Sequence, residues 1–332
     1  MMTWLRSWVS MALAATWLVH GAAHADDIQA SLDALAARAS PGMLGVEVLD
    51  LQDGRVWKVH ADRDYPMMSV FKAPLGALVL SKVERHELTL DQQVTVTRAD
   101  LRHGKSPIAD RFHGDSQRFS LRQLLVAAVH DSDNTAADIV LRLAGGPAAL
   151  TSFLHSHGIE GLRVDRGEGE IYNDTMGLDS HGQPPASETP QAQALRIQRG
   201  VAGYMADPRD RSTPDAAVTF LRKLTKGELL SAASTRQLLT MMTNSPPFRI
   251  DTGLPQHVTF AHKGGTSGTF NGMTPAFNDI GIAQFPDGHA VIVAAFMTGA
   301  HLSETDRAAL FHDLGTLVGR VHPAPLKSSP AP

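Results

Sequence analysis

Short apolar runs rich in β-branched residues lie near the beginning and toward the end of the chain. They cover residues 43–51, 55–60, 258–262, 279–285 and 290–297. The first two runs are joined through Asp53-Gly54 and the last two through Pro286-Asp287-Gly288, which are turn sequences typical of β-hairpins. We therefore expect antiparallel strands in both end regions of the chain.

Elsewhere, apolar residues recur at three- and four-residue spacing, which is the pattern of amphipathic helices. Helices are expected at residues 28–37, 69–83, 121–130, 134–143, 147–157, 229–242 and 304–321, and a further one is expected to begin at Thr213-Pro214. The region after residue 83 should be mostly helical. This order predicts an α/β lobe built from both termini and a helical lobe inserted into it. Active sites often lie between two such lobes.

Residues 165–213 differ from this pattern. They are rich in Gly, Pro, Asp and Ser, and residues 192–204 are their main apolar cluster. The composition predicts a long irregular segment, and such segments inside a compact domain are usually functional or disordered.

The first residues have the features of a secretory signal. Arg6 supplies a positive start, residues 9–19 an apolar stretch, and Ala23-His24-Ala25 a small-x-small cleavage site. The apolar stretch is too short for a membrane span of about 20 residues. We expect residues 1–25 to be a signal peptide, and the Pro-rich residues 323–332 to be a disordered tail.

Composition excludes several kinds of site. The 332 residues include no cysteine, which rules out disulfides, cysteine nucleophiles and thiolate metal ligands. The net charge of −4 and the dispersed basic residues argue against nucleic-acid binding. Sixteen histidines are present, but His155 and His157 are two apart and no His-Glu-x-x-His occurs. We expect no metal and no cofactor.

The pair Ser69 and Lys72 is the first candidate for chemistry. Residues three apart on a helix lie on nearly one face, so these side chains would be neighbours. A serine hydroxyl becomes a good nucleophile when a base takes its proton, and a buried lysine can lose its own proton and serve as that base. Alone, most matches to this spacing would be a surface serine beside a solvated lysine.

Three further segments carry candidate groups. In Ser132-Asp133-Asn134, between two helices, Ser132 could relay a proton and Asn134 could donate to a substrate carbonyl, although the same residues could simply cap a helix. Lys263 follows an apolar strand, and its charge suits an anionic substrate. The glycines after it would let a substrate backbone approach closely. Glu168 could activate water, or could be one more surface carboxylate.

Ser-x-x-Lys, Ser-Asp-Asn and Lys-x-Gly in this order resemble the serine β-lactamases and penicillin-binding proteins, and Glu168 makes the set most similar to the class A β-lactamases. The resemblance implies an α/β (α+β) fold with an antiparallel sheet flanked by helices. It implies a single catalytic domain over residues 26–322, with an α/β lobe at 26–63 and 215–322 and a helical lobe at 64–214. It also implies a monomeric periplasmic enzyme that contacts no membrane after signal cleavage and hydrolyses penicillins or cephalosporins.

The resemblance also implies roles for particular residues. Ser69 would be the nucleophile, and Lys72, or Glu168 through a water, would take its proton. Ser132 would protonate the departing nitrogen. The backbone N–H groups of Ser69 and Thr266 would form the oxyanion hole. The remaining roles are binding and positioning roles: Lys263, Thr266 and Ser267 for the substrate carboxylate, Asn134 for its side-chain amide, and an Arg166–Asp210 ion pair to close the loop that carries Glu168.

Several positions depart from the family pattern. After Glu168 the usual Pro-x-Leu-Asn is replaced by Gly-Glu-Ile-Tyr, so Tyr172 and Asn173 are both candidates to hold the deacylating water. Lys105 stands where many members place an aromatic residue that walls the cleft. No arginine follows Ser267 on the next strand, so carboxylate binding should depend on Lys263 and its neighbours. An insertion at about 175–206 lengthens the span from Arg166 to Asp210.

Two alternatives share the three serine and lysine motifs. One is a D,D-peptidase or other cell-wall serine hydrolase, and the other is a β-lactam sensor that becomes acylated and does not turn over. Glu168 favours the β-lactamase, because peptidases of this fold generally lack a deacylating glutamate.

Overall fold

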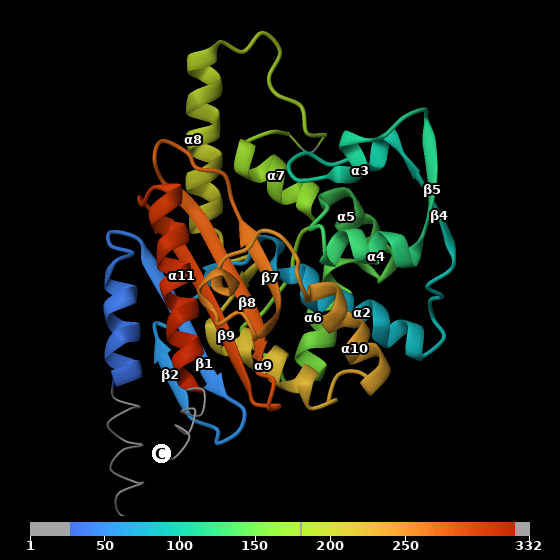
Figure 1. Cartoon of the computed structure of the whole chain (residues 1–332). Helices are drawn as coiled ribbons and strands as arrows, with labels where there is room; N and C mark the ends of the chain where they lie inside the picture. The colour runs from blue at the N-terminus through green and yellow to red at the C-terminus, as the bar shows by residue number, and fades with distance from the viewer. Residues whose placement is uncertain (1–26, 180, 323–332) are drawn as a thin grey trace, which may run out of the picture.

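The computed structural model describes residues 27–179 and 181–322, so the expected signal peptide and C-terminal tail lie outside the described residues. Its centre is a five-stranded antiparallel sheet of order β2-β1-β9-β8-β7 (Figure 1). The strands are β1 (Met43–Asp50), β2 (Val56–Val59), β7 (Thr259–Thr266), β8 (Thr274–Gln284) and β9 (Ala290–Ala300). The antiparallel sheet expected from both ends of the chain is confirmed.

Alternate residues of the strands enter two separate cores, as the two-residue period of a strand requires. On β9, Val293, Ala295 and Met297 pack on one face with the helix at residues 27–37 and with α11 (Glu304–Val321). Ile292, Ala294 and Phe296 pack on the other face, toward α9 (Pro214–Thr225) and the helical part of the molecule. The sheet is therefore covered on both faces (Figure 1).

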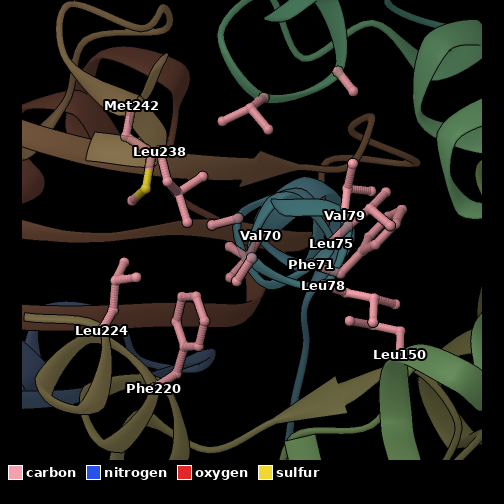
Figure 2. Close-up of a cluster of buried hydrophobic side chains, with 14 of the residues drawn as sticks. Val70, Phe71, Leu75, Leu78, Val79, Leu150, Phe220, Leu224, Leu238 and Met242 are labelled. Carbon is pink, nitrogen blue, oxygen red and sulfur yellow. The ribbon is translucent and has the colours of Figure 1, made fainter. Parts of the chain in front are cut away.

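The helical part is built around the turn η1 (Met68–Phe71) and the helix α2 (Lys72–Glu84), whose first ten residues are all buried. Figure 2 shows Val70, Phe71, Leu75, Leu78 and Val79 surrounded by side chains of other elements: Leu150 of α6 (Gly146–Ser156), Phe220 and Leu224 of α9, and Leu238 and Met242 of α10 (Ala232–Met242). The predicted helices α4 (Leu121–Val129), α5 (Asn134–Leu143) and α11 are also present. Because α2 is buried on all sides, its first residues are held in place by the core.

Among the described residues, no single helix is long and apolar enough to cross a membrane. Only α5 and α6 taken together pass that test of length and composition, and they are bent by 72° at the break between them.

The expectation of a mostly helical region after residue 83 was wrong in part. β4 (Gln93–Thr97) pairs with β5 (Ser116–Ser120), and between them lie η2 (Arg98–Asp100) and α3 (Pro107–Asp110). Both strands are largely polar and only partly buried, so they lack the apolar alternation from which a strand is predicted.

The prediction of an irregular segment at residues 165–213 was also wrong, because this segment contains two helices. These are α7 (Glu168–Met176) and α8 (Pro190–Ala206), followed by the short strand β6 (Arg211–Ser212), which pairs with β3 (Tyr65–Pro66). α8 projects beyond the rest of the molecule (Figure 1) and buries only Val201 and Tyr204. A helix that buries so little surface has almost no apolar periodicity from which it could be predicted.

Candidate active site

A cavity of about 420 Å³ opens between the helical part and the edge strand β7. Eight of the residues singled out from the sequence line it: Ser69, Lys105, Ser132, Asn134, Glu168, Tyr172, Thr266 and Ser267. Lys72 and Lys263 are fully buried and lie behind this surface. The three motifs and Glu168 therefore meet at one place, although they are spread along the chain.

The nucleophile segment is held by strands β7 and β8. Met68, just before Ser69, has a positive φ of 48°, a conformation that persists only where neighbours enforce it. The side chain of Asn278 donates to the carbonyl oxygens of Pro66 (2.7 Å) and Met67 (3.1 Å). Gly265 lets β7 pack closely, since a Cβ there would overlap the Met67 carbonyl oxygen. The glycine expected to admit a substrate backbone thus admits the protein's own backbone.

One carboxylate oxygen of Glu168 contacts both the nucleophile, Ser69, and the other proposed base, Lys72. Ser69 Oγ donates to Glu168 Oε1 at 2.9 Å, and Lys72 Nζ lies 2.9 Å from the same oxygen. Lys72 Nζ also donates to the Ser132 carbonyl oxygen (2.8 Å) and to Asn134 Oδ1 (2.7 Å). Lys72 Nζ thus contacts three oxygen atoms, and Glu168 is the group that already accepts a hydrogen bond from the serine hydroxyl, so it is placed to accept the serine proton.

Ser132 and Lys263 form a second pair. Ser132 has a φ of 60°, and its Oγ accepts from Lys263 Nζ at 2.9 Å; the same amine donates to the Gly264 carbonyl oxygen at 2.9 Å. Burial, with Lys72 and Lys105 nearby, holds the pKa of Lys263 well below its usual value. Because Lys263 has no exposed surface, it reaches a substrate through Ser132 and by its charge, and not by the direct contact with a carboxylate that the sequence suggested.

Both alternatives considered for Ser132-Asp133-Asn134 are present together. Asp133 is the N-cap of α5, accepting from Ala136 N at 2.8 Å. Because Asp133 does the capping, Ser132 and Asn134 on either side are left to face the cavity. Asn134 Nδ2 donates to the His103 carbonyl oxygen at 3.0 Å, and its second hydrogen is available to a substrate carbonyl.

Asp138, which the sequence reasoning missed, places the glutamate. Its carboxylate accepts from Glu168 N (2.6 Å) and Gly169 N (3.1 Å), and it pairs with Arg102 at 2.6 Å. Burial raises the pKa of Asp138, and the hydrogen bond from Arg102 acts in the opposite direction. A Cβ on Gly169 would lie 2.7 Å from Arg102 Nε, which explains why glycine follows Glu168 in this chain. Asp138 could have been found from the sequence by its position one turn after Asn134, on the same face of the helix.

Arg249 is the second residue that was missed. It is 3 % exposed, donates to the carbonyl oxygens of Gly265 (3.2 Å) and Asn278, and donates to Thr266 Oγ1. Its guanidinium lies 4.0 Å from the ring centre of Phe277, and burial lowers the pKa of Arg249 to about 10. No arginine follows Ser267 on the next strand, and Arg249, just before η3 (Ile250–Gly253), supplies the positive charge there instead. It places a positive charge directly behind Thr266.

The expected Arg166–Asp210 ion pair is present, with Arg166 Nε 2.6 Å from Asp210 Oδ2. Arg166 also pairs with Asp174 and, at 3.1 Å, with Asp207. Burial opposes its charge, but the hydrogen bond and charge of Asp210 outweigh it and raise the pKa of Arg166. Asp174 and Asp207 lie at the ends of α7 and α8, so one guanidinium ties both helices together.

The two candidates for the water-holding residue lie apart. Tyr172 lines the cavity and stacks on His103, with ring centres 4.8 Å apart. Asn173 does not line it and faces a second cavity of about 970 Å³ beyond that stack, so the structure does not support the role proposed for Asn173.

The other two lining residues chosen from the sequence make contacts of their own. Lys105 Nζ donates to the Pro246 carbonyl oxygen at 3.3 Å. Ser267 Oγ bonds the backbone of Ala276, accepting from its N–H at 2.9 Å. Ser267 thus helps to fix the turn after β7. Around the described residues, no cluster of three or more His, Asp or Glu side chains has the arrangement of a metal site.

Comparisons with known proteins agree with this geometry. Residues 25–321 match the family described as the β-lactamase enzyme family. The chain is 33 % identical to the extended-spectrum β-lactamase PER-1 of Pseudomonas aeruginosa over 271 residues, which are 80 % of this chain and 79 % of PER-1. It is 30 % identical to β-lactamase L2 of Stenotrophomonas maltophilia, over 86 % of this chain and 82 % of that relative.

Solved structures give the same result. A β-lactamase from Chitinophaga pinensis superposes with a TM-score of 0.75 at 27 % identity, covering 89 % of this chain and 99 % of that one. An ancestral class A β-lactamase superposes with a TM-score of 0.72 at 32 % identity, covering 89 % of this chain and 100 % of that one. The chain therefore belongs to the β-lactamase enzyme family and is a class A serine β-lactamase.

Proposed function

We propose that this enzyme hydrolyses penicillins and cephalosporins through an acyl-serine intermediate on Ser69. The observation that carries the proposal is the 2.9 Å contact of Glu168 Oε1 with both Ser69 Oγ and Lys72 Nζ. It places a proton acceptor on the nucleophile and a cation beside that acceptor. A serine that must lose a proton as it attacks requires such a neighbour.

In acylation, Ser69 Oγ attacks the β-lactam carbonyl carbon while Glu168 accepts its proton. The N–H groups of Ser69 and Thr266 stabilise the developing oxyanion, a contribution typically of about 3–4 kcal/mol per donor. The carbon–nitrogen bond then breaks, and the nitrogen takes a proton from Ser132 Oγ, which lies 2.9 Å from its own donor Lys263. Lys72, which lies 2.9 Å from Glu168 Oε1 and donates to the Ser132 carbonyl oxygen, passes the proton from Glu168 to Ser132 Oγ, so Glu168 is a carboxylate again before deacylation. The net transfer is one proton from Ser69 to the ring nitrogen.

In deacylation, Glu168 takes a proton from water, and the resulting hydroxide attacks the ester carbonyl. The bond to Ser69 Oγ breaks, and that oxygen takes the proton from Glu168, which restores the carboxylate. Support for this role is the rigid placement of the carboxylate by Asp138, which fixes the N-terminus of α7 through two backbone hydrogen bonds. A water-activating carboxylate has to be positioned in this way to act in every turnover.

The substrate is anionic in this proposal. Arg249 and Lys263 supply positive charge behind Thr266 and Ser132, and a carboxylate at that end of the cavity would accept from the Thr266 hydroxyl. Asn134 then faces the substrate's side-chain amide from the opposite wall. Because PER-1 is named an extended-spectrum β-lactamase, we propose an extended substrate spectrum for this enzyme as well.

We also propose that the enzyme acts as a monomer in the periplasm, after export by residues 1–25 and removal of that segment. Arg6, the short apolar stretch and Ala23-His24-Ala25 support export. Cell fractionation, the intact mass of the mature protein and sedimentation would test these points. A membrane-bound full-length chain would contradict them.

The central test follows the turnover of a chromogenic cephalosporin together with the intact mass of the protein. Wild type should turn over steadily, and Ser69→Ala should neither turn over nor gain mass. Glu168→Ala should acylate more slowly, because it lacks the base, and should then retain the acyl adduct, because it cannot activate water. A wild-type adduct that persists without turnover would instead support the sensor alternative. Hydrolysis of D-alanyl-D-alanine peptides without β-lactam turnover would support the peptidase alternative.

A further inference from the structure

The inserted helix α8 has one deeply buried polar side chain. Of its seventeen residues only Val201 and Tyr204 are buried, and Tyr204 is 2 % exposed. The exposed remainder includes Leu195, which is 52 % exposed. The helix is therefore anchored to the molecule mainly at its C-terminal end.

Tyr204 contacts the residue before the nucleophile. Its hydroxyl donates to Met68 Sδ at 3.1 Å, and Met68 lines the active-site cavity. Met68 is also the residue with the left-handed φ of 48° that turns the chain into Ser69. Since such a conformation must be enforced by its surroundings, a contact to this side chain bears directly on the orientation of the Ser69 hydroxyl.

Tyr204 also belongs to the cluster that closes the Glu168 segment. The guanidinium of Arg166 lies 5.8 Å from its ring centre and that of Arg211 lies 5.3 Å away, both within the range of cation–π attraction. Arg211 donates in addition to the Tyr204 carbonyl oxygen. One side chain thus bridges the Arg166 ion-pair cluster and the nucleophile turn.

The same helix supports α7, which carries Glu168. Gly200 of α8 packs against the C-terminal end of α7, where a Cβ would lie 2.7 Å from Gly177 N and 2.8 Å from the Asp174 carbonyl oxygen. Arg196 joins Glu188 at 2.7 Å and donates to the Met176 carbonyl oxygen. α8 is therefore in contact with the elements that carry both the nucleophile and the base.

We propose that Tyr204 is a positioning residue for acylation, holding Met68 so that Ser69 Oγ stays aligned with Glu168. This inference rests on the proposed acyl-serine mechanism. It assigns to the insertion the task of aligning the nucleophile. Deacylation, in which the water and Glu168 are held by α7 and Asp138, does not depend on the Tyr204 hydroxyl.

The test is Tyr204→Phe, which removes the hydroxyl and keeps the ring over both arginines. Loss of one hydrogen bond should slow acylation by a chromogenic cephalosporin about five- to tenfold in stopped-flow measurements, with the deacylation rate unchanged. Leu195→Gln, on the exposed side of the same helix, is the matched control and should change neither rate. A general structural role would instead lower both rates together with the melting temperature.

Met68→Leu provides the second arm, because it removes the sulfur acceptor. If the contact carries the effect, the double variant should acylate no more slowly than the slower single variant. Acylation of Tyr204→Phe at the wild-type rate, or effects of the two substitutions that simply multiply, would overturn the inference.

The affinity for phenylboronic acid, which bonds to a nucleophilic serine oxygen, separates this inference from the proposed function. It should weaken about five- to tenfold in Tyr204→Phe even if the wild type failed to turn over β-lactams. Unchanged boronic acid affinity in a folded Tyr204→Phe protein would count against the inference alone. Absence of acylation in the wild type would count against the proposed function alone.

Discussion

Lys263 Nζ lies 2.9 Å from Ser132 Oγ, and the lysine side chain has no exposed surface. A cation without access to water is costly to the fold, since its hydration is lost and only two oxygens replace it. The lysine is therefore kept at this place for its effect on Ser132 and on anionic substrates. The lysine is thus needed for the reaction and not for the stability of the fold.

Lys263→Met should abolish most turnover without lowering the free energy of unfolding at pH 7. The pKa of Lys263 in the folded state is lowered, chiefly by burial. Between that lowered value and the unfolded value of about 10.4, the unfolded chain binds more protons, so raising the pH stabilises the folded wild type. Urea unfolding at several pH values should show the wild type gaining stability relative to Lys263→Met as the pH rises toward 10. A constant difference would show that the buried lysine pKa is not lowered.

Two glycines of α8 should respond to alanine with opposite signs. A Cβ on Gly203 meets nothing within 4 Å, so Gly203→Ala should stabilise the protein by about 0.5–1 kcal/mol through better helix propensity. A Cβ on Gly200 would meet backbone atoms of α7, so Gly200→Ala should destabilise the protein and slow deacylation by shifting Glu168. Thermal unfolding and single-turnover kinetics of both variants measure this. Equal effects would mean that α8 does not pack closely on α7.

The site residues that the sequence predicted are those that form short motifs, with two functional residues within a few positions of each other. Ser69 with Lys72, and Ser132 with Asn134, lie close together in the chain, so their spacing alone indicated a site. Arg249 could not be found in this way, because its partners in β7 and β8 lie 16 to 29 residues away along the chain and two of them are backbone carbonyl oxygens.

The segment after Glu168 shows the limit of prediction from composition. Once α7 is known to be a helix, Tyr172 lies four residues after Glu168 on the same face, while Asn173 is turned about 100° away. Choosing between Tyr172 and Asn173 therefore required knowing that this segment is a helix. The segment is mostly polar with little apolar periodicity, so the sequence did not predict that helix. The sheet was predicted well, because strands buried on both faces appear in the sequence as continuous apolar runs.

Arg249→Ala should weaken the processing of anionic substrates more than that of neutral ones. The guanidinium donates to Thr266 Oγ1, the hydroxyl proposed to meet the substrate carboxylate. Loss of this charge-assisted contact should lower kcat/KM for a penicillin about ten- to a hundredfold. A methyl ester of the same penicillin is the control and should lose much less. A similar loss for acid and ester would indicate that Arg249 supports only the shape of β7.

Tyr172→Ala should remove the partition between the two cavities and change substrate preference. Tyr172 and His103 line both cavities and stack on each other across the boundary. Without the ring, a β-lactam with an aromatic side chain loses a flat apolar contact, and its KM should rise about five- to tenfold. The KM for a substrate with a small aliphatic side chain should change less. Tyr172→Phe keeps the stacked ring and should leave both values near wild type, so a rise in that variant would assign the effect to the hydroxyl group and not to the wall.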